Sequence, residues 1–199
     1  MRVAKPRHPR LHLGSGNLRF PGWVNLDLRY GHDLRRGLPD WEDASVDAVY
    51  SCHFLEHVTH GEGEALLAEV YRVLRPGGTA RVGVPDLERF ARAYVDGDDA
   101  FARLYFERYC PPGQEAAPRR YAELGAVGAL LAIVHGWEHR AMYDETVLRR
   151  AFEDAGFAPG SIVRHAFGEG GDAGLAARDL RYDDHSLFLE ATKAVERRS

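Results

Sequence analysis

The sequence predicts an α/β fold with a mostly parallel, doubly wound sheet. Three observations support this prediction: short apolar runs alternate with turn signals over the first 85 residues, a strongly periodic helix separates two of these runs, and a glycine turn directly follows the first run. Strand–helix–strand alternation with short connections is typical of parallel sheets. The length of 199 residues suits a single domain, which we expect to span residues 1–199.

The first half of the chain supplies most of the expected sheet. A helix is predicted over residues 59–74, because apolar side chains recur there at three- and four-residue spacing, and Pro76-Gly77-Gly78 should end it. Apolar runs bounded by turn residues predict strands on both sides of this helix and near the end of the chain. The expected strands are residues 10–13, 23–27, 46–51, 79–85, 161–167 and 185–193.

The second half of the chain is expected to be more helical. Asp144 is a suitable N-cap for a late helix that Gly156 should end. We expect residues 97–134 to form a helical insertion or lid. The predicted helices lie near residues 86–95, 98–109, 119–134 and 145–155. The polar stretches are expected to be solvated or, where glycine-rich, mobile loops: residues 96–99, 168–174 and 179–184.

Composition and charge argue against several functions. The net charge is −4 with histidine neutral, and there is no basic stripe, so we expect no nucleic-acid partner. The longest apolar stretch, residues 124–134, is too short to span a bilayer, so we expect no membrane segment. Its apolar faces suit a core, a cap over the site or a homodimer interface. Two cysteines without a CxxC spacing indicate a reducing, cytoplasmic environment.

The glycine turn LHLGSGN predicts a ligand site after the first strand, because glycine allows close approach to the backbone. A dinucleotide site needs a third glycine that opens a helix, and here that position is Arg19. The acid that ends the next strand, Asp27, follows Gly16 by eleven residues instead of about 20. A nucleoside ligand without phosphate, such as S-adenosyl-L-methionine (SAM), fits this spacing. The alternative is that Gly14 and Gly16 merely turn the chain.

The order of these segments resembles the class I SAM-dependent methyltransferases. The matching segments are LHLGSGN, PGWVNLD, HDLRRGLPDWEDASVDAVYSCHFLEHV, EVYRVLRPGGTARVGVPDLERF, HGWEHRAMYDETVLRRAFEDAGF and HSLFLEATK. The similarity is greatest to a compact bacterial subgroup, methyltransferase type 11-like, whose first helix is shortened. The resemblance implies a seven-stranded, Rossmann-like sheet, a helical insertion before the last two strands, and SAM as the cofactor.

The resemblance also implies a set of cofactor contacts: the glycine turn against the methionine part, Asp27 on the ribose, and residues of HDLRRGLP beside the adenine. The family usually has an acid two residues before the first glycine, where this chain has His12. Glu56 is the candidate to replace that acid, since a lost charged hydrogen bond costs about 1.5–3 kcal/mol. The expected SAM contacts are Gly14, Ser15, Gly16, Asp27, Leu28, Asp33, Leu34, Cys52, His53 and Glu56.

Two segments, HFLEH (residues 53–57) and HGWEH (residues 135–139), fit the H-x-x-E-H spacing of zinc hydrolases. Such a site needs both histidines on one helix plus a third ligand. His53 lies too near a strand end for this, and glycine interrupts the second segment, so we assign no metal ligand. Histidine can accept a proton near neutral pH, which makes His57, His135 and His139 the candidate catalytic residues. Structural roles remain the alternative for all three.

These observations predict a SAM-dependent methyltransferase that acts on an oxygen or nitrogen of a small-molecule acceptor, such as a sugar, a polysaccharide precursor or a secondary metabolite. Two alternatives stay open: a metal-dependent hydrolase that uses an H-x-x-E-H site, and a non-catalytic SAM-binding protein. Aromatic residues in the second half are candidates either for an acceptor pocket or for a plain core. They are Tyr105, Phe106, Tyr109, Tyr121, Trp137 and Tyr143.

Overall fold

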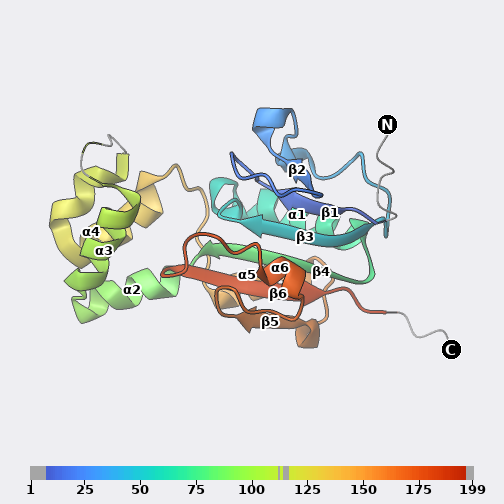
Figure 1. Ribbon diagram of the computed structural model, residues 1–199. Helices are drawn as coiled ribbons and strands as arrows, with labels where there is room; N and C mark the ends of the chain where they lie inside the picture. The colour runs from blue at the N-terminus through green and yellow to red at the C-terminus, as the bar shows by residue number, and fades with distance from the viewer. Residues whose placement is uncertain (1–7, 112, 114–116, 196–199) are drawn as a thin grey trace.

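The computed structural model describes residues 8–111, 113 and 117–195. Its centre is a six-stranded sheet in the order β2-β1-β3-β4-β6-β5, in which β6 runs antiparallel to both neighbours (Figure 1). The first four strands in this order are parallel to one another, as the first half of the sequence predicts. The strands are β1 (Arg10–Leu13), β2 (Val24–Leu26), β3 (Val46–Cys52), β4 (Leu74–Pro85), β5 (Ile162–His165) and β6 (Ser186–Thr192).

The expectation of seven strands is wrong for the described residues, which form six. The connection between β2 and β3 contains two 3-10 turns, Leu28–Tyr30 and Leu34–Arg36, in place of a further strand. The side chains of Asp27 and Asp33 cap these turns by accepting backbone N–H groups. Because the capped turns close the chain on itself, the connection does not extend along the edge of the sheet.

The chain between β1 and β2 forms no helix, so even the shortened first helix of the related subgroup is absent there. The Asn25 side chain explains how this turn is held without one. Its Oδ1 accepts from Phe20 N at 2.8 Å, and its Nδ2 donates to the Phe20 and Trp23 carbonyls at 3.2 and 3.1 Å. The backbone groups are thereby satisfied by a side chain instead of a helix.

Helices cover the two faces of the sheet unequally (Figure 1). α1 (His60–Val73) and α5 (Glu145–Asp154) pack on one face and bury the main hydrophobic core. The opposite face is covered by the single turn of α6 (Ala173–Ala176) and by coil around it, with Leu175 against Tyr50. The doubly wound prediction therefore holds for one face, and the second face is covered mainly by non-helical chain.

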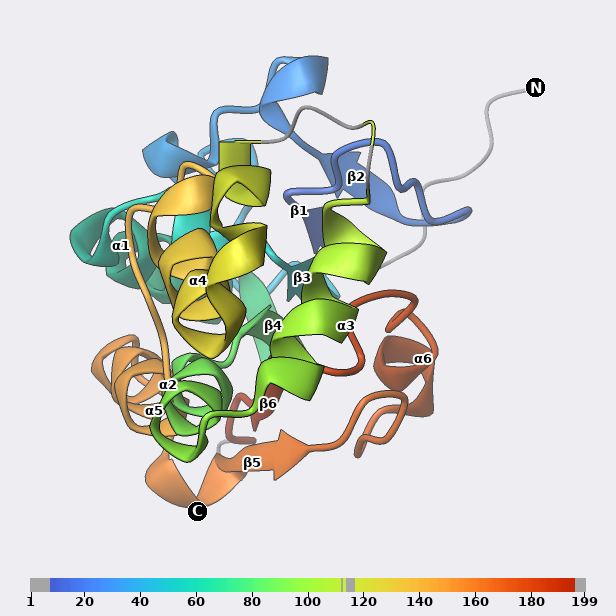
Figure 2. The same cartoon turned by 90° about the vertical axis from the view of Figure 1, so that its left-hand side faces the viewer.

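The described residues between 87 and 136, which we call the helical unit, lie beyond the carboxyl ends of β3 and β4 (Figures 1 and 2). They pack around a separate aromatic core. The helix predicted over residues 119–134 is divided at Gly125, where φ is +61° and Asp99 Oδ1 accepts from Ala126 N at 2.8 Å. The elements are α2 (Leu87–Asp96), α3 (Asp99–Tyr109), a 3-10 segment (Ala117–Leu124), α4 (Gly125–Leu131) and a π-helix (Ala132–Gly136).

The segment between β5 and β6 is anchored by a buried ion-pair cluster. Arg81 on β4 pairs with Asp179, and its Nη1 donates to Glu190 Oε1 at 3.0 Å. All three side chains are buried. Gly168 N and Gly171 N donate to these two carboxylates at 2.9 and 2.8 Å. The expectation of a solvated loop over residues 179–184 is therefore wrong for Asp179, because its carboxylate is buried in an ion pair with Arg81.

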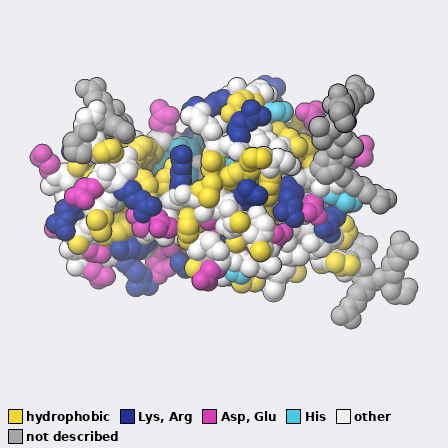
Figure 3. All heavy atoms as spheres, in the orientation of Figure 1, with side chains coloured by type: hydrophobic (Ala, Val, Ile, Leu, Met, Phe, Trp, Pro, Cys, Tyr) yellow, Lys and Arg dark blue, Asp and Glu magenta, His cyan; other side chains and the backbone are white. Residues whose placement is uncertain are grey.

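Basic and acidic side chains are interspersed over the face of the molecule seen in Figure 3. Among the residues that the structure describes, no helix is both long and apolar enough to cross a lipid bilayer.

Candidate active site

The glycine turn after β1 is closed against the loop that follows β3. Gly14 has a φ of +65°, and a Cβ atom on it would lie 2.5 Å from Phe54. The N–H groups of Gly14 and Ser15 donate to the Leu26 carbonyl at 2.9 and 3.2 Å. Only glycine suits position 14, because the position requires a left-handed backbone and has no space for a side chain.

Asp27, the expected ribose ligand, lies beside this turn at the end of β2. Its Oδ2 accepts from Gly16 N and its Oδ1 from Arg29 N, both at 2.9 Å. The side chain is 16% exposed. Because a carboxylate offers about four acceptor positions, two remain for the hydroxyl groups of a ligand.

A cavity of about 190 Å³, which we call the glycine-turn pocket, opens next to these residues. Its described lining contains no acidic side chain. Four lining residues come from the segment between α6 and β6 and are absent from the expected SAM contacts: Arg178, Leu180, Arg181 and Tyr182. Five lining residues are among the expected SAM contacts: Gly14, Ser15, Gly16, Cys52 and His53.

His12 occupies the position where the resembling family usually has an acid. Its imidazole is neutral and already contacts Phe20 and Asn25. Its ring stacks on Phe20 at 4.1 Å, and its Nδ1 lies 3.2 Å from Asn25 Oδ1. Burial lowers the pKa of His12 to about 4. His12 therefore does not replace the carboxylate that the resembling family usually has at this position.

Arg178 and Arg181 both bring positive charge to the glycine-turn pocket, and Arg178 is the one with an unsatisfied buried N–H. Its guanidinium lies 5.1 Å from the Phe20 ring centroid and 5.5 Å from that of Trp23. Its Nε is buried without an acceptor, and no described carboxylate forms an ion pair with Arg178. A buried N–H without an acceptor is costly, so this atom is suited to meet an anionic group of a ligand.

The residues expected beside adenine line a separate cavity of about 210 Å³ that includes Leu28, Asp33, Leu34, Phe54 and His57. Arg35 donates to both oxygens of Asp33 at 2.8 Å. These hydrogen bonds lower the pKa of Asp33 and keep it ionised. The structure thus brings Leu28, Asp33 and Leu34 together, whereas Glu56 does not line this cavity.

A third cavity, of about 280 Å³, lies between the strand ends and the helical unit, and we call it the histidine cavity. It draws side chains from both H-x-x-E-H segments, from α3 and from the chain before β6. Of the aromatic residues considered for an acceptor pocket, Tyr105, Tyr109 and Trp137 line it. The complete lining is His53, Glu56, His57, Tyr105, Tyr109, Ile133, Trp137, His139, Tyr182 and His185.

His53 and Tyr182 line both the glycine-turn pocket and the histidine cavity. Their rings stack at 3.9 Å with an interplanar angle of 20°. Both residues have left-handed backbones, with φ of +52° and +66°, which is uncommon for side chains of this size. His53 is held by Ser186, whose Oγ lies 2.7 Å from its Nε2. The stacked pair is therefore the wall between the two spaces, and both of its residues have an unfavourable backbone conformation.

Glu56 is the most unusual side chain of the histidine cavity. It is 0% exposed, and neither carboxyl oxygen has a hydrogen-bond partner. The nearest ring nitrogen, His53 Nδ1, lies 3.4 Å from Oε1 without hydrogen-bond alignment. Burial raises the pKa of Glu56 to about 8. Its backbone carbonyl accepts from Arg140 N and Ala141 N at 2.7 and 3.2 Å, which joins the two H-x-x-E-H segments.

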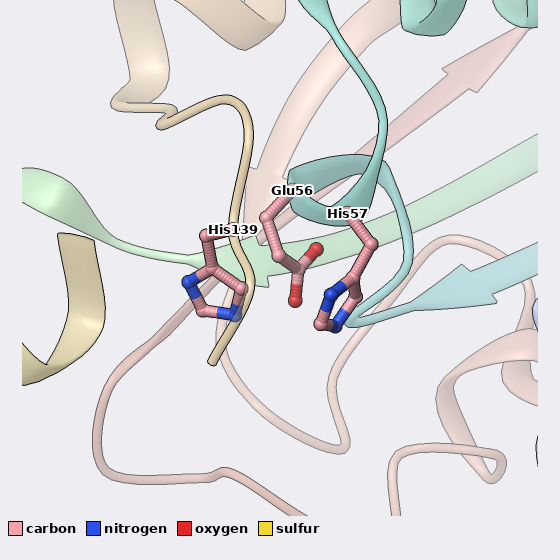
Figure 4. Close-up of side chains that lie close together, drawn as sticks. All are labelled: Glu56, His57 and His139. Atoms are coloured by element: carbon pink, nitrogen blue, oxygen red, sulfur yellow. The ribbon is translucent and has the colours of Figure 1, made fainter. Parts of the chain in front are cut away.

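One histidine of each segment approaches Glu56. The rings of His57 and His139 lie 4.9 Å apart, and the Glu56 carboxyl group lies between them (Figure 4). His139 Nδ1 lies 2.5 Å from the Ile133 carbonyl, so this nitrogen carries the proton and Nε2 is free. Burial lowers the pKa of both imidazoles, that of His139 to about 4. His135 is exposed and does not line the cavity.

His185, which the sequence-based prediction omits, is oriented by an acid on the opposite side of the cavity. Its Nδ1 lies 2.7 Å from Asp184 Oδ1, which also accepts from Tyr109 Oη at 2.7 Å. Although burial acts to raise it, these hydrogen bonds hold the pKa of Asp184 below its ordinary value. No described residue bonds to His185 Nε2, so this nitrogen is free to accept a proton in the cavity.

Neither H-x-x-E-H segment lies on a continuous helix. The first runs from the end of β3 into a 3-10 turn (Leu55–His57), and the second leaves the π-helix for extended chain. The sequence-based objection to a hydrolase site within one segment is therefore supported by the local geometry. The proximity of His57 to His139 had no signal in the sequence beyond the repeated spacing itself.

Comparison with known proteins supports the family resemblance. A family model described as a methyltransferase domain matches residues 22–82. No curated protein matches the sequence. The predicted resemblance to class I SAM-dependent methyltransferases is confirmed by this match over residues 22–82, and the solved structures below share the fold.

Three solved structures share the fold at low sequence identity. A SAM-dependent methyltransferase from Archaeoglobus fulgidus is 13% identical, with a TM-score of 0.52 over 95% of this chain and 87% of that one. One from Thermotoga maritima is 17% identical, with a TM-score of 0.53 over 94% and 83%. The methyltransferase in complex with the Haloferax volcanii Trm112 activator is 17% identical, with a TM-score of 0.51 over 100% and 87%.

Proposed function

We propose that this chain transfers a methyl group from SAM to an oxygen or nitrogen of a small-molecule acceptor bound in the histidine cavity. The observation that carries the proposal is the shared wall of His53 and Tyr182 between two unlike spaces. One space has a glycine turn and an arginine without a carboxylate partner, and the other has histidines and a buried glutamate. The volume of the histidine cavity, about 280 Å³, suits a small acceptor.

The described residues fit SAM at three points. Arg178, with its unpartnered Nε, is placed to meet the carboxylate of the methionine part. Asp27 retains acceptor positions for the ribose hydroxyls, and the cavity at Leu28 and Asp33 suits the adenine. His12 is neutral, so backbone carbonyl groups of the turn are left to meet the ammonium group.

The residues of the histidine cavity orient the acceptor and take its proton. SAM, when bound, would supply a methyl group on a cationic sulfur, with the neutral thioether as the leaving group. His185 Nε2, oriented through Asp184, accepts the proton that the acceptor loses. Glu56, His57 and His139 form the polar wall that holds the reacting oxygen or nitrogen, while the aromatic side chains exclude water.

The lining of the histidine cavity supports a revised set of candidate catalytic residues. His57 and His139 remain, because both line the histidine cavity, and His185 joins them. His135 is not retained, because its exposed side chain lies outside the cavity. The acceptor classes expected from the sequence, namely sugars, polysaccharide precursors and secondary metabolites, all present a hydroxyl or amino group of suitable size.

Calorimetry with SAM and S-adenosylhomocysteine tests the cofactor site. We expect binding by the wild type and a loss of at least about tenfold for Asp27→Ala and Arg178→Met, as for a lost charged hydrogen bond. Arg150→Met is the matched control, because Arg150 pairs only with Asp154 on the surface of α5. Equal affinity of Arg178→Met and Arg150→Met would refute the carboxylate assignment.

Transfer of a labelled methyl group from SAM to a panel of hydroxylated and amino compounds tests the reaction. We expect product with the wild type and a large loss of kcat for His185→Gln with unchanged SAM affinity. SAM binding without transfer to any compound of the panel would favour the alternative of a non-catalytic SAM-binding protein.

A further inference from the structure

We propose that Glu56, His57 and His139 bind a first-row transition-metal cation in the histidine cavity, and that this ion holds a hydroxyl oxygen of the acceptor. The inference rests on the proposed function, because it assigns a substrate class to the same cavity. It specifies that the acceptor atom that receives the methyl group is oxygen and not nitrogen.

The first observation is the ligand geometry. Each of the three residues offers one ligand atom, and these atoms lie within 4.8 Å of one another (Figure 4). Ligands about 2.1 Å from a common ion lie roughly 3–3.5 Å apart. Small side-chain rotations therefore suffice to close the set around an ion. Two imidazoles and one carboxylate form a ligand set typical of zinc, iron, cobalt and manganese.

The second observation is independent of this spacing. Glu56 is completely buried, and both carboxyl oxygens lack a hydrogen-bond partner among the described residues. Buried carboxyl groups are normally paired or coordinate a metal. The Glu56 carboxyl group lies between the imidazoles of His57 and His139, and His53 Nδ1, at 3.4 Å, does not hydrogen-bond it either. A cation between Glu56, His57 and His139 would supply the missing partner.

The third observation concerns His139. Its Nδ1 donates to the Ile133 carbonyl, which orients the ring and leaves the Nε2 lone pair toward Glu56 and His57 (Figure 4). Metal-binding histidines commonly donate their second ring nitrogen to a backbone carbonyl in this way. The backbone bonds from Arg140 and Ala141 to the Glu56 carbonyl hold the two segments in register. The site is thus preorganised from two distant parts of the chain.

Sequence reasoning assigned no metal because it considered each H-x-x-E-H segment by itself. The site takes Glu56 and His57 from the first segment and only His139 from the second. Three protein ligands leave positions open in the cavity. An acceptor hydroxyl fits these positions better than an amine does, because a cation lowers the pKa of a bound hydroxyl and favours its loss of a proton to His185.

Cobalt binding to the full chain tests the site. After treatment with a chelator, we expect the wild type to bind one Co²⁺ per chain, with visible absorption bands, and Zn²⁺ to displace it. We expect Glu56→Gln and His139→Asn to weaken binding at least about 100-fold, because each removes one of three ligands. His135→Asn is the matched control, since it alters the other histidine of the same segment outside the cavity, and it should bind Co²⁺ as the wild type does.

Equal Co²⁺ affinity of Glu56→Gln, His139→Asn and the wild type, or no binding by the wild type, would overturn the metal proposal. SAM calorimetry on the same samples separates this failure from that of the proposed function. We expect the chelator-treated wild type to bind SAM. Failure of the wild type to bind SAM counts against the proposed function, whereas SAM binding with metal-independent transfer to a hydroxyl counts against the metal alone.

Discussion

The glycine-turn pocket and the histidine cavity meet at one stacked pair but are built in different ways. The glycine-turn pocket depends on backbone shape: a left-handed glycine, a turn closed on the Leu26 carbonyl and a carboxylate that caps it. The histidine cavity depends on side chains from four distant segments of the chain. The difference indicates that the turn of the proposed cofactor site is set by local sequence, whereas the proposed acceptor site can be changed by substitution without rebuilding the sheet.

The charges of the two spaces differ as well. Arg178 gives the glycine-turn pocket a cation without a carboxylate partner in the described chain, while the histidine cavity contains a buried carboxyl group and neutral imidazoles. In each space a polar group lacks the partner that its burial demands. Such groups reduce stability, and proteins retain them where a ligand supplies the partner.

The largest effect should come from the cluster that supports both spaces. Arg81→Met leaves Asp179 and Glu190 buried without their cation, so we expect unfolding free energy to fall by about 3–5 kcal/mol. SAM binding should also weaken, because Asp179 anchors the segment that carries Arg178 and Tyr182. Urea denaturation of this variant and of the surface control Arg150→Met measures the difference. A loss below 1 kcal/mol would show that the cluster does not support these walls.

The next effect should be confined to the glycine-turn pocket. Gly14→Ala requires a left-handed alanine whose Cβ meets Phe54, and we expect a loss of about 2–3 kcal/mol together with loss of SAM binding. Gly16→Ala is the matched control, because its φ is +50° but nothing lies within 4 Å of its added Cβ. It should cost about 1–2 kcal/mol, from backbone strain alone. Similar losses for the two variants would contradict the close approach at Gly14.

The glycine turn was predictable because its function depends on adjacent residues. The spacing from Gly16 to Asp27 excluded a phosphate-binding helix, and the structure has no helix there. Apart from Asp27, which lines neither cavity, the expected contacts from Gly14 to His53 line the glycine-turn pocket or the cavity at Leu28 and Asp33. Nothing in the sequence around Arg178 indicated that it lines the pocket. It follows a glycine-rich stretch whose position depends on Arg81, which is far away in the sequence.

A third prediction concerns the histidine cavity alone. Glu56→Met replaces an unpartnered buried carboxyl group with an apolar side chain, so we expect the metal-free protein to gain about 1–3 kcal/mol of unfolding free energy. Methyl transfer should be lost in the same variant. Thermal melts after chelator treatment measure the gain. A destabilised Glu56→Met protein would mean that the carboxyl group has a structural partner.

The smallest predicted effect is a pH dependence from the glycine-turn pocket. The pKa of His12 is lowered to about 4 in the folded chain, so the unfolded chain binds more protons between that value and about 6.5. Stability should therefore fall as pH falls through this range. Between pH 7.5 and 5.5 we expect His12 to account for about 1.4 kcal/mol of the fall.

Denaturation of His12→Gln at the same two pH values checks this assignment. The variant should lose less stability than the wild type over the interval, by about the same 1.4 kcal/mol. If the pH dependence of the unfolding free energy is the same in the variant and the wild type, the loss of stability comes from the other buried imidazoles and not from His12.

The histidine cavity was predictable only in part. The repeated H-x-x-E-H spacing identified His57 and His139, but it also identified His135, which is exposed. The sequence spacing does not show that the two H-x-x-E-H segments meet, nor that His185 lies in the same cavity. Both facts depend on how the helical unit packs over the strand ends. The prediction of a seventh strand was wrong for a different reason. The connection between β2 and β3 forms capped 3-10 turns after Asp27 and Asp33 instead of a strand.

Nuclear magnetic resonance with SAM labelled with ¹³C at the transferable methyl tests the central claim most directly. The claim is that a cofactor in the glycine-turn pocket directs its methyl group past His53 and Tyr182 into the histidine cavity. We predict nuclear Overhauser effects from the bound methyl group to ring protons of His57, His139 or His185. Contacts of the methyl group confined to the glycine turn and Arg178, with none to these rings, would contradict the account.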